Sequence, residues 1–498
     1  MLSIIILIPL FSAAAALFLK QKRNIEIFGI AAQALIVVLS FFIISQIAGG
    51  GMILSRDQWL MADALSAYIA AIVSVIGLTA LIYSSGYLNE ELKINAIFPK
   101  QVKRYYAFVH LFIFAMLLAL FSDNLALMWI AIEGTTLATA FLINFYNNQK
   151  TLEAAWKYLI ICTIGISIAL LGTVLTYYAA LQSGASASDV LAWSSLVAFA
   201  SQLNPDLLKI AFIFVFVGYG TKVGLAPFHT WLPDAHSRAP SPISALLSGV
   251  LLNVALYGIL RFKVITDAAL GGHDFSNMLF MIFGVISVVM ASLIILVAKK
   301  YKRLLAYSSI EHMGLIALGI GFGTPLSMLG SLWHFMNHAL AKSTLFFISG
   351  NILLKYHTGS IGKVRSMIKV IPTSAVLFLI GVAVIVGLPP FAPFLSKFFI
   401  LSGGFSSGNI FASVAVLLAL AVAFAGFFIH ANRMIFGEPP TLMHECGGKP
   451  SSPEPEKGEA SKIALGLIAF NFLLILAMGV FLPVYLANLF EQIRNILL

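Results

Sequence analysis

Charge is scarce in this sequence: Asp, Glu, Lys and Arg make up only 10% of its 498 residues, whereas hydrophobic residues make up 60%. A soluble protein carries about a quarter charged residues, so this composition argues against one. The sequence also has only two cysteines, no CxxC pair and no Gly-rich phosphate loop. From these absences we expect no redox centre, no nucleotide site, and no metal or other cofactor held by this chain.

Long apolar runs take the place of the missing charge. Each is long enough, at about twenty residues, to cross a hydrocarbon core of about 30 Å. The sequence therefore predicts an all-α, polytopic membrane protein without a soluble domain. We expect about fourteen transmembrane helices, at 2–19, 25–48, 63–88, 105–122, 124–144, 154–182, 207–228, 243–264, 276–298, 304–322, 326–354, 371–404, 409–436 and 462–487.

Basic residues lie mostly on one side of this predicted bundle. With the N-terminus outside, the odd-numbered connections and their edges hold 22 of the 30 Lys and Arg residues, and the outer side holds five. The positive-inside rule then predicts a multi-pass protein of the inner, cytoplasmic membrane with both termini outside. Lys20, Lys22 and Arg23 follow the first apolar run, which favours a retained helix over a signal peptide. Lipid headgroups account for the net charge of +10, so we expect no nucleic acid partner.

Three lysines fall inside predicted spans: Lys222, Lys342 and Lys397. On a continuous helix Lys222 would lie about 20 Å into the membrane. A charge at that depth costs several kcal/mol unless it meets a partner or water. The alternative is that the Lys222 side chain extends to the membrane surface. It is the weaker one because the site is too deep.

The stretch around Lys222, VGYGTKVGLAPFHTWLPDAH, is rich in helix-weakening residues. We expect Gly218, Gly220 and Gly224, with Pro227, to loosen the helix. Irregular backbone at membrane depth persists only where it is buried in protein or lines a wet cavity. The stretch therefore predicts a broken seventh helix that carries a titratable amine.

GLAPF at 224–228 has a second copy, GLPPF at 387–391, again beside a membrane lysine. Broken helices at corresponding places, here helices 7 and 12, indicate a transporter built from repeats. Each repeat holds five spans, and because five is odd the second must be inverted. The predicted organisation is N-terminal helices at 1–104, a first inverted repeat at 105–264, a second at 276–436, a cytoplasmic loop at 437–461 and a C-terminal helix at 462–498.

Glu133 is the expected partner of Lys222. It lies in NLALMWIAIEGTTLATAFLIN, a span that carries no other charge. An isolated carboxylate would be protonated there, whereas one beside an ammonium can stay ionised. A titrating pair is the favoured interpretation because Lys222 lies on a breakable helix. The alternative is a salt bridge that only locks the fold.

His334, His338 and Lys342 follow one another at intervals of four, which places them on one helix face. Imidazole exchanges protons near neutral pH, so this ladder favours a proton relay. Metal binding by the two histidines is an alternative, but no carboxylate accompanies them in the motif.

Weaker signals surround this ladder. Glu311 and His312 in YSSIEHMG could extend a polar axis. His229 and His236 follow the seventh helix and could form its cytoplasmic mouth, although capping and loop packing explain them as well. The loop 437–461 is rich in Pro, Ser and Glu, which predicts a flexible connection; a metal site at its His444 and Cys446 is a remote alternative.

Several of these motifs occur together in one known family. The run TKVGLAPFHTWLPDAHSRAPSPISALLSGVLLNVALYGILR, with FSDNLALMWIAIEG before it and HFMNHALAKSTLFF after it, resembles the antiporter-like proton-translocating subunits. These occur in respiratory complex I, Mrp-type sodium/proton antiporters and membrane-bound NiFe hydrogenases. SSIEHMG and PPFAPFLSKFFIL are most similar to component F of hydrogenase-4 and formate hydrogenlyase complexes.

The resemblance implies fourteen helices with two inverted repeats, and it implies roles for individual residues. Glu133 matches the fifth-helix glutamate, Lys222 the seventh-helix lysine and Lys397 the twelfth-helix residue of the exit channel. The members of the ladder match the eleventh-helix histidines and central lysine. One position departs from the pattern: Asn253 stands where many members have a titratable lysine or histidine, so a water chain or a different link must join the halves.

The resemblance further implies a function without a catalytic centre in this chain. A redox reaction in a peripheral arm with iron–sulfur or NiFe subunits would shift charge along the buried row, and the chain would contact other membrane subunits and lipid. Two related alternatives are the D-type component of an Mrp sodium/proton antiporter and an M-type or N-type component of complex I. A substrate permease fits less well because of the lysine row.

Overall fold

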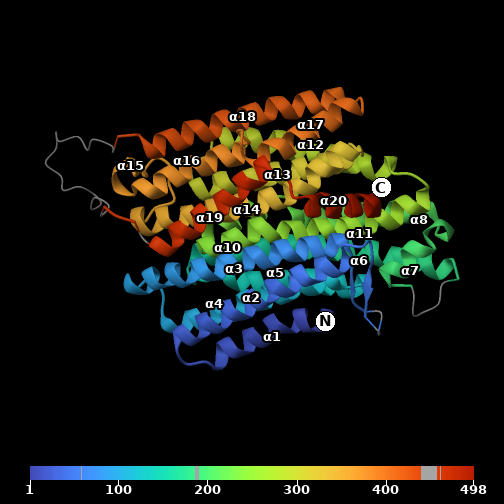
Figure 1. Cartoon of the computed structure of the whole chain (residues 1–498), viewed down its shortest axis with the longest axis horizontal. Helices are drawn as coiled ribbons and strands as arrows, with labels where there is room; N and C mark the ends of the chain where they lie inside the picture. The colour runs from blue at the N-terminus through green and yellow to red at the C-terminus, as the bar shows by residue number, and fades with distance from the viewer. Residues whose placement is uncertain (56, 58, 185–189, 439–456, 460) are drawn as a thin grey trace.

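The computed structural model describes residues 1–55, 57, 59–184, 190–438, 457–459 and 461–498. Long helices lie side by side along one axis (Figure 1). In a hydrocarbon core every backbone N–H and C=O must be paired inside the chain, so apolar runs fold as helices. The predicted all-α membrane architecture is confirmed. In the described part of the chain ten helices are long and apolar enough to cross a membrane, so the count of fourteen stays a prediction.

The N-terminal region holds three long helices and one small hairpin, which the sequence did not predict. In chain order these are α1 (Leu2–Phe18), α2 (Lys22–Ile47), β1 (Ile53–Leu54), β2 (Met61–Ala62) and α3 (Ala64–Lys93). Asp63 caps α3, accepting a hydrogen bond from the Ser66 N–H. Helix α3 is the central one of the three, because it packs against both α2 and the distant α14.

Two series of helices follow. The first consists of α4 (Pro99–Phe121), α5 (Leu125–Ile143), α6 (Gln149–Gln182), α7 (Trp193–Ala198), η1 (Ala200–Gln202), α8 (Pro205–Val223), α9 (Trp231–Arg238), α10 (Ser241–Leu246), the π turn η2 (Leu247–Leu251) and α11 (Leu252–Leu270). The second consists of α12 (Asp274–Leu296), α13 (Tyr301–Gly321), α14 (Pro325–Tyr356), α15 (Met367–Val370), α16 (Pro372–Val386), α17 (Ala392–Ser406) and α18 (Ile410–Ile435). The chain ends with α19 (Lys462–Val480) and α20 (Val484–Leu497).

The fourth long helix of each series is interrupted, as predicted. Gly224 ends α8 with φ of 80°, and the next N–H donates to the Gly220 carbonyl at 3.0 Å. Gly387 ends α16 with φ of 84°, and the next N–H donates to the Ala383 carbonyl at 2.9 Å. Left-handed backbone closed by this bond pattern is a standard helix stop, and glycine adopts it without a Cβ penalty. The exact repeat boundaries remain a prediction.

The glycines before this stop have a different role from the one we expected. Helix α8 runs unbroken through Gly218 and Gly220. A Cβ on Gly218 would lie 2.5 Å from the Ala169 nitrogen and the Gly165 oxygen of α6. Gly218 therefore permits close approach of α6 and α8 rather than loosening the helix.

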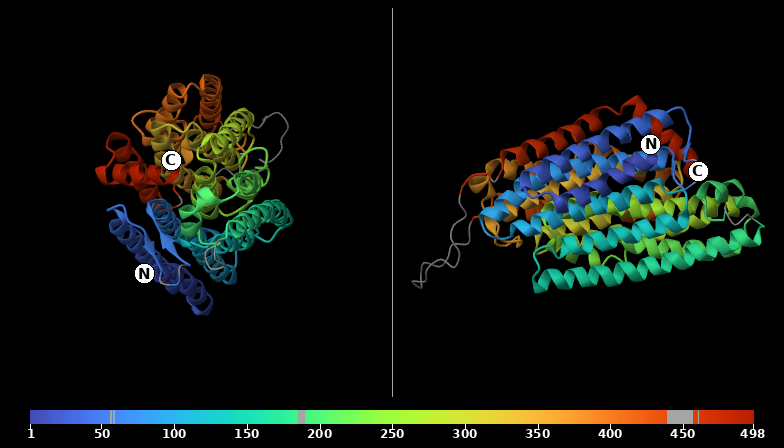
Figure 2. Two further views of the ribbon diagram at one scale, coloured as in Figure 1. Left: turned by 90° about the vertical axis from the view of Figure 1, so that its right-hand side faces the viewer. Right: turned by 90° about the horizontal axis from the view of Figure 1, so that it is seen from below.

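Both termini lie at the same end of the bundle, which agrees with the even number of spans that the sequence predicts (Figures 1 and 2). The predicted loop 437–461 connects helices at the opposite end, and most of it, including His444 and Cys446, lies outside the described residues. Side chains of α10, η2, α11 and α13 are almost all buried, whereas peripheral helices such as α2 and α18 expose large apolar residues. The interior helices are the ones that position the site.

Candidate functional site

Lys222 lies in the last turn of α8 and is completely buried. Its Nζ donates hydrogen bonds to Thr136 Oγ1 of α5 at 2.6 Å and to the Tyr158 hydroxyl of α6 at 2.9 Å. The same tyrosine hydroxyl shares a 2.6 Å hydrogen bond with Thr139 Oγ1. Hydroxyl groups of two neighbouring helices therefore hold the ammonium.

Glu133 does not contact Lys222 directly. The expectation that the carboxylate lies beside the ammonium is therefore wrong. Within the described residues no carboxylate lies within 4.0 Å of the Lys222 Nζ. Instead Thr136, one turn further along α5, donates to Glu133 Oε2 at 2.9 Å while it accepts from Lys222. Glu133 is only half-buried, and its Oε1 accepts from the exposed Thr163 of α6 at 3.0 Å. A hydroxyl relay thus joins carboxylate to ammonium, and the only signal in the sequence was a threonine three residues after Glu133.

The histidine ladder of α14 recruits a third imidazole from α13. His312 Nδ1 lies 2.7 Å from His334 Nε2, and their rings stack with centroids 4.9 Å apart. The His312 ring also stacks on His338 at 5.6 Å. His334 Nδ1 lies 2.8 Å from the Ser396 hydroxyl of α17. His312 was predicted as an extension of the polar axis, and the structure places it between the two rungs of the ladder.

Lys342 is completely buried one turn beyond His338. Its Nζ donates to the Leu305 carbonyl of α13 at 2.8 Å. Both ring nitrogens of His338 are buried without a hydrogen-bond partner in the described part of the chain. Buried polar atoms of this kind are normally satisfied by water or by another polar group.

Lys397 lies in α17, just beyond the second break. Its Nζ donates to the carbonyls of Ile385 at 3.0 Å and Val386 at 3.3 Å, which are the last carbonyls of α16. A Cβ on Gly387 would lie 3.2 Å from the Lys397 Cδ, so the glycine leaves room for the lysine stem. Glu311 of α13 lies 3.7 Å from the same Nζ. Glu311, which the sequence indicated only weakly as a site residue, therefore has a specific partner in Lys397.

Asn253 lies between the two halves. It is completely buried, and its Nδ2 donates to the Gly249 carbonyl in the π turn at 3.1 Å. Its Oδ1 has no partner among the described residues. The neighbouring Ser248 hydroxyl lies 2.7 Å from that of Ser309 in α13. These polar atoms lie where a link between the halves is needed, but the link itself stays a prediction.

His236 is not at a surface mouth, contrary to the prediction. It is fully buried and stacks on Phe346 of α14 with ring centroids 5.1 Å apart. The reason is that α9 presents one face, including Trp231 and His236, to the interior. His229 is half-buried and lies in the break, with its ring 6.2 Å from that of Tyr307.

Arg261 is one of the five basic residues that the charge count placed on the outer side of the predicted bundle, but the structure buries it. It forms two hydrogen bonds with Asp63, at 2.6 and 2.7 Å, and its guanidinium lies 4.3 Å from the centre of the Trp193 ring. This bidentate pair ties α11 to the start of α3. Lys263, also expected on that side, is buried and contacts Asp267. Lys263 and Asp267 both lie on α11, so this second pair, unlike the first, lies within one helix.

No group of three or more His, Cys, Asp or Glu side chains that could hold a metal ion occurs among the residues that the structure describes. The fold and the buried row of lysines, glutamates and histidines define a multi-pass membrane protein of the ion-transporting, antiporter-like class. Residues 122–422 match the family described as the transmembrane part of NADH:quinone oxidoreductase and Mrp antiporter subunits. The chain belongs to this family.

Individual relatives cover most of both chains. The sequence is 36% identical to the hydrogenase-4 component F homolog of Methylacidiphilum infernorum, over 87% of this chain and 88% of the relative. It is 26% identical to the D-type Na(+)/H(+) antiporter protein of Bacillus subtilis, over 86% of this chain and 85% of the relative. A chain in the structure of the membrane-bound sulfane sulfur reductase, an archaeal respiratory membrane complex, shares the fold at TM-score 0.85 with 24% identity, covering 100% and 97% of the two chains.

Proposed function

We propose that this chain is the proton-translocating subunit of a redox-driven membrane complex of hydrogenase or formate hydrogenlyase type. The observation that carries the proposal is the row of ionisable side chains that begins at the half-buried Glu133 and continues through buried residues to Lys397. Such residues are costly inside a membrane and mark ion pathways. The relative that shares 36% identity is named as a hydrogenase component, which supports this type of complex over the others.

The first half of the path consists of Glu133, Thr136 and Lys222. The carboxylate favours the charged form of the lysine through the intervening hydroxyl, because an opposite charge nearby stabilises an ammonium. When that influence is withdrawn, the lysine releases its proton toward the centre of the bundle. The polar atoms of Asn253 and of the π turn mark the direction of the transfer.

The second half runs from Lys342 to Lys397. His338, His312 and His334 pass the proton by accepting it at one ring nitrogen and releasing it from the other. Ser396 connects the last imidazole to the helix that carries Lys397. Glu311 holds Lys397 charged in the same way as Glu133 holds Lys222.

The orientation and the partners belong to the same proposal. Both termini face outward in the inner membrane, and the end that carries the loop 437–461 faces the cytoplasm. The apolar outer helices contact lipid or other membrane subunits. Since no redox step is assigned to this chain, a peripheral arm with iron–sulfur or NiFe subunits supplies the driving reaction.

A sodium/proton antiporter component is the second candidate. The antiporter relative from Bacillus subtilis is similar over 86% of the chain. Purification of the native complex, with identification of the co-migrating subunits, separates the two. Redox subunits support the proposal, whereas small antiporter subunits without any redox protein contradict it.

A further inference from the structure

A second group of buried polar side chains lies outside the row from Glu133 to Lys397. Glu91, in the last turn of α3, is only 5% exposed. Its Oε1 accepts a hydrogen bond from the Tyr146 hydroxyl at 2.5 Å, and that hydroxyl lies 3.0 Å from the Tyr87 hydroxyl. Oε2 of Glu91 is buried without a partner among the described residues. A buried carboxylate oxygen of this kind normally either accepts a hydrogen bond from water or carries a proton.

Lys302 is the charged neighbour of Glu91. It lies in the first turn of α13, is 5% exposed, and its Nζ donates to the Ala239 carbonyl at 3.0 Å. The group around Glu91 reaches α14 through tyrosines: the Tyr87 ring stacks on that of Tyr83, and the Tyr83 hydroxyl donates to the Phe347 carbonyl at 2.7 Å. The arrangement leaves both charges hydrogen-bonded to neutral groups rather than to each other.

His236 continues the line toward Lys342. Its ring stacks on Phe346, one turn after Lys342 on α14, and Ala239, whose carbonyl accepts from Lys302, lies three residues after it at the end of α9. Its two ring nitrogens are buried, and neither has a hydrogen-bond partner in the described part of the chain. The Lys342 Nζ donates to the Leu305 carbonyl, one turn along α13 from Lys302. Glu91, Lys302, His236 and Lys342 thus follow one another through α3, α13, α9 and α14.

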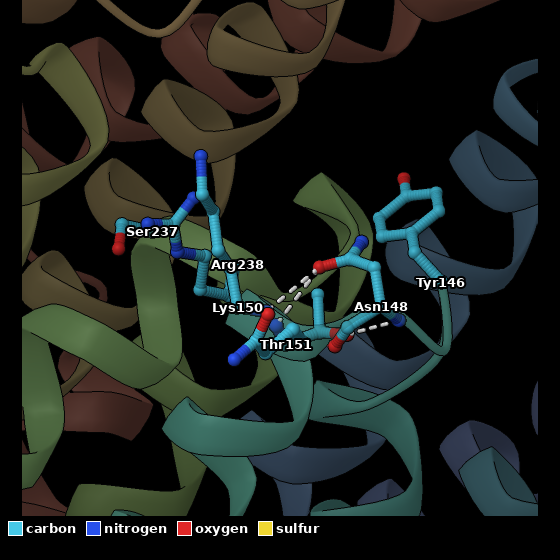
Figure 3. Close-up of a pocket in the computed structure, with 7 residues that line it drawn as sticks. Tyr146, Asn148, Lys150, Thr151, Ser237 and Arg238 are labelled. Carbon is cyan, nitrogen blue, oxygen red and sulfur yellow. Dashed lines mark hydrogen bonds between the residues drawn. The ribbon is translucent and has the colours of Figure 1, made fainter.

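Tyr146 connects the group formed by Glu91, Lys302 and His236 to the surface of the protein. It lines a pocket of about 530 Å³ together with Asn148, Gln149, Lys150, Thr151, Ser237 and Arg238 (Figure 3). It also lines a second surface pocket beside α4. The hydroxyl that binds Glu91 therefore belongs to a side chain in contact with two openings at the bundle end opposite the termini.

We propose that Glu91, Lys302 and His236 form a second proton inlet, which leads from the Tyr146 pocket to Lys342 without passing Lys222. The inference rests on the proposed function and adds a separate point of proton uptake to it. Water in the pocket gives a proton to the Glu91 carboxylate, which becomes neutral. The proton then passes to one nitrogen of His236, the other nitrogen releases its proton to the Lys342 amine, and Glu91 returns to its charged form. Lys302 favours that return because its charge stabilises the carboxylate.

Glu91→Gln in the intact complex tests the inlet. Glutamine keeps the shape and an acceptor for the Tyr146 hydroxyl but cannot carry the proton. Glu90→Gln is the matched control, because Glu90 is the adjacent residue and pairs with Lys93 at the surface. In proteoliposomes we expect Glu91→Gln to pump protons at least about tenfold more slowly than the parent, Glu91→Asp to regain most of the rate, and Glu90→Gln to match the parent.

Parallel measurement of Lys342→Ala separates this inference from the proposed function. If Lys342→Ala stops pumping but Glu91→Gln pumps at the parental rate, the inlet is wrong and the main path stands. If Lys342→Ala itself pumps normally, the proposed function fails. A lower thermal unfolding midpoint of Glu91→Gln with unchanged pumping per assembled complex would assign Glu91 to the fold and overturn the inlet.

Discussion

At the scale of single residues, the three buried lysines of the row, Lys222, Lys342 and Lys397, share one feature: neutral groups provide their closest contacts. Two hydroxyls hold Lys222, a backbone carbonyl holds Lys342, and two carbonyls hold Lys397 at shorter range than its carboxylate does. A buried ammonium in a direct carboxylate pair is locked in its charged form. The neutral acceptors around Lys222 and Lys342 leave these two lysines able to take either form, which a proton path requires.

Glu133→Gln should leave the complex assembled and reduce proton translocation at least about tenfold. The amide keeps the size of the side chain and an acceptor for Thr136, so only the charge and the titrating proton are lost. Pumping by the reconstituted complex is the measurement. Asp63→Asn is the contrasting variant, because it breaks the buried pair with Arg261 at a cost of about 3–5 kcal/mol and should reduce assembly. Parental pumping by Glu133→Gln would remove Glu133 from the mechanism.

Lys342→Ala should stop pumping more completely than His334→Ala. His312 lies beside both His334 and His338, so one missing rung can be bypassed by the remaining imidazoles and water. We expect His334→Ala to retain about a tenth of the parental rate or more, and Lys342→Ala to retain none above background. Equal loss in both variants, with intact assembly, would refute the relay.

At the scale of helices, the two breaks use the same stop but place their lysines differently. Lys222 precedes the stop in α8, whereas Lys397 follows the stop in α17 and reaches back to the last carbonyls of α16. The C-terminal end of a helix carries a partial negative charge that favours a cation. At the second break, the end of α16 therefore helps to stabilise the charged form of Lys397. At the first break, threonine and tyrosine hydroxyls have this role for Lys222.

Gly218→Ala should destabilise the protein, whereas Gly220→Ala should not. A methyl group at 218 would overlap the α6 backbone at 2.5 Å, and overpacking of this kind costs about 1–3 kcal/mol. At 220 the nearest atom would lie at 3.8 Å, so alanine fits and favours the helix. Thermal unfolding in detergent compares the two variants. Equal stability would show that α6 and α8 do not need close contact at Gly218.

Helices and their breaks could be predicted from the sequence because both depend on local rules: apolar length fixes a span, and Gly-Leu-x-Pro ends one. The site was only partly predictable. Pairing of His312 with His334, or of Glu311 with Lys397, depends on how α13 packs against α14 and α17. Lys302 resembles an ordinary lysine at the edge of a span, and only the packing of α9 against α13 reveals its burial.

At the scale of the whole molecule, charge asymmetry and the placement of the termini agree. The predicted cytoplasmic side holds 22 of the 30 basic residues, and both termini lie together at the other end of the bundle (Figure 2).

The predicted orientation can be tested with single cysteines in a variant whose Cys162 and Cys446 are replaced by alanine and serine. Ala96→Cys lies at an exposed turn on the predicted cytoplasmic side, and Gly272→Cys at an exposed turn on the outer side. A membrane-impermeant thiol reagent added outside should label only Gly272→Cys. Ala96→Cys should react after the membrane is opened. The reverse pattern would invert the topology and the direction of transport.

Lys222 tests the central claim most directly, because every step of the first half depends on its proton. Methionine keeps the apolar stem without the charge, and arginine keeps the charge but does not release its proton at accessible pH. Proton pumping by the complex in proteoliposomes is measured for Lys222→Met and Lys222→Arg beside electron transfer. Both variants should assemble, retain electron transfer at reduced or uncoupled rates, and lose pumping. Pumping by Lys222→Met at the parental rate would show that the amine serves only the fold.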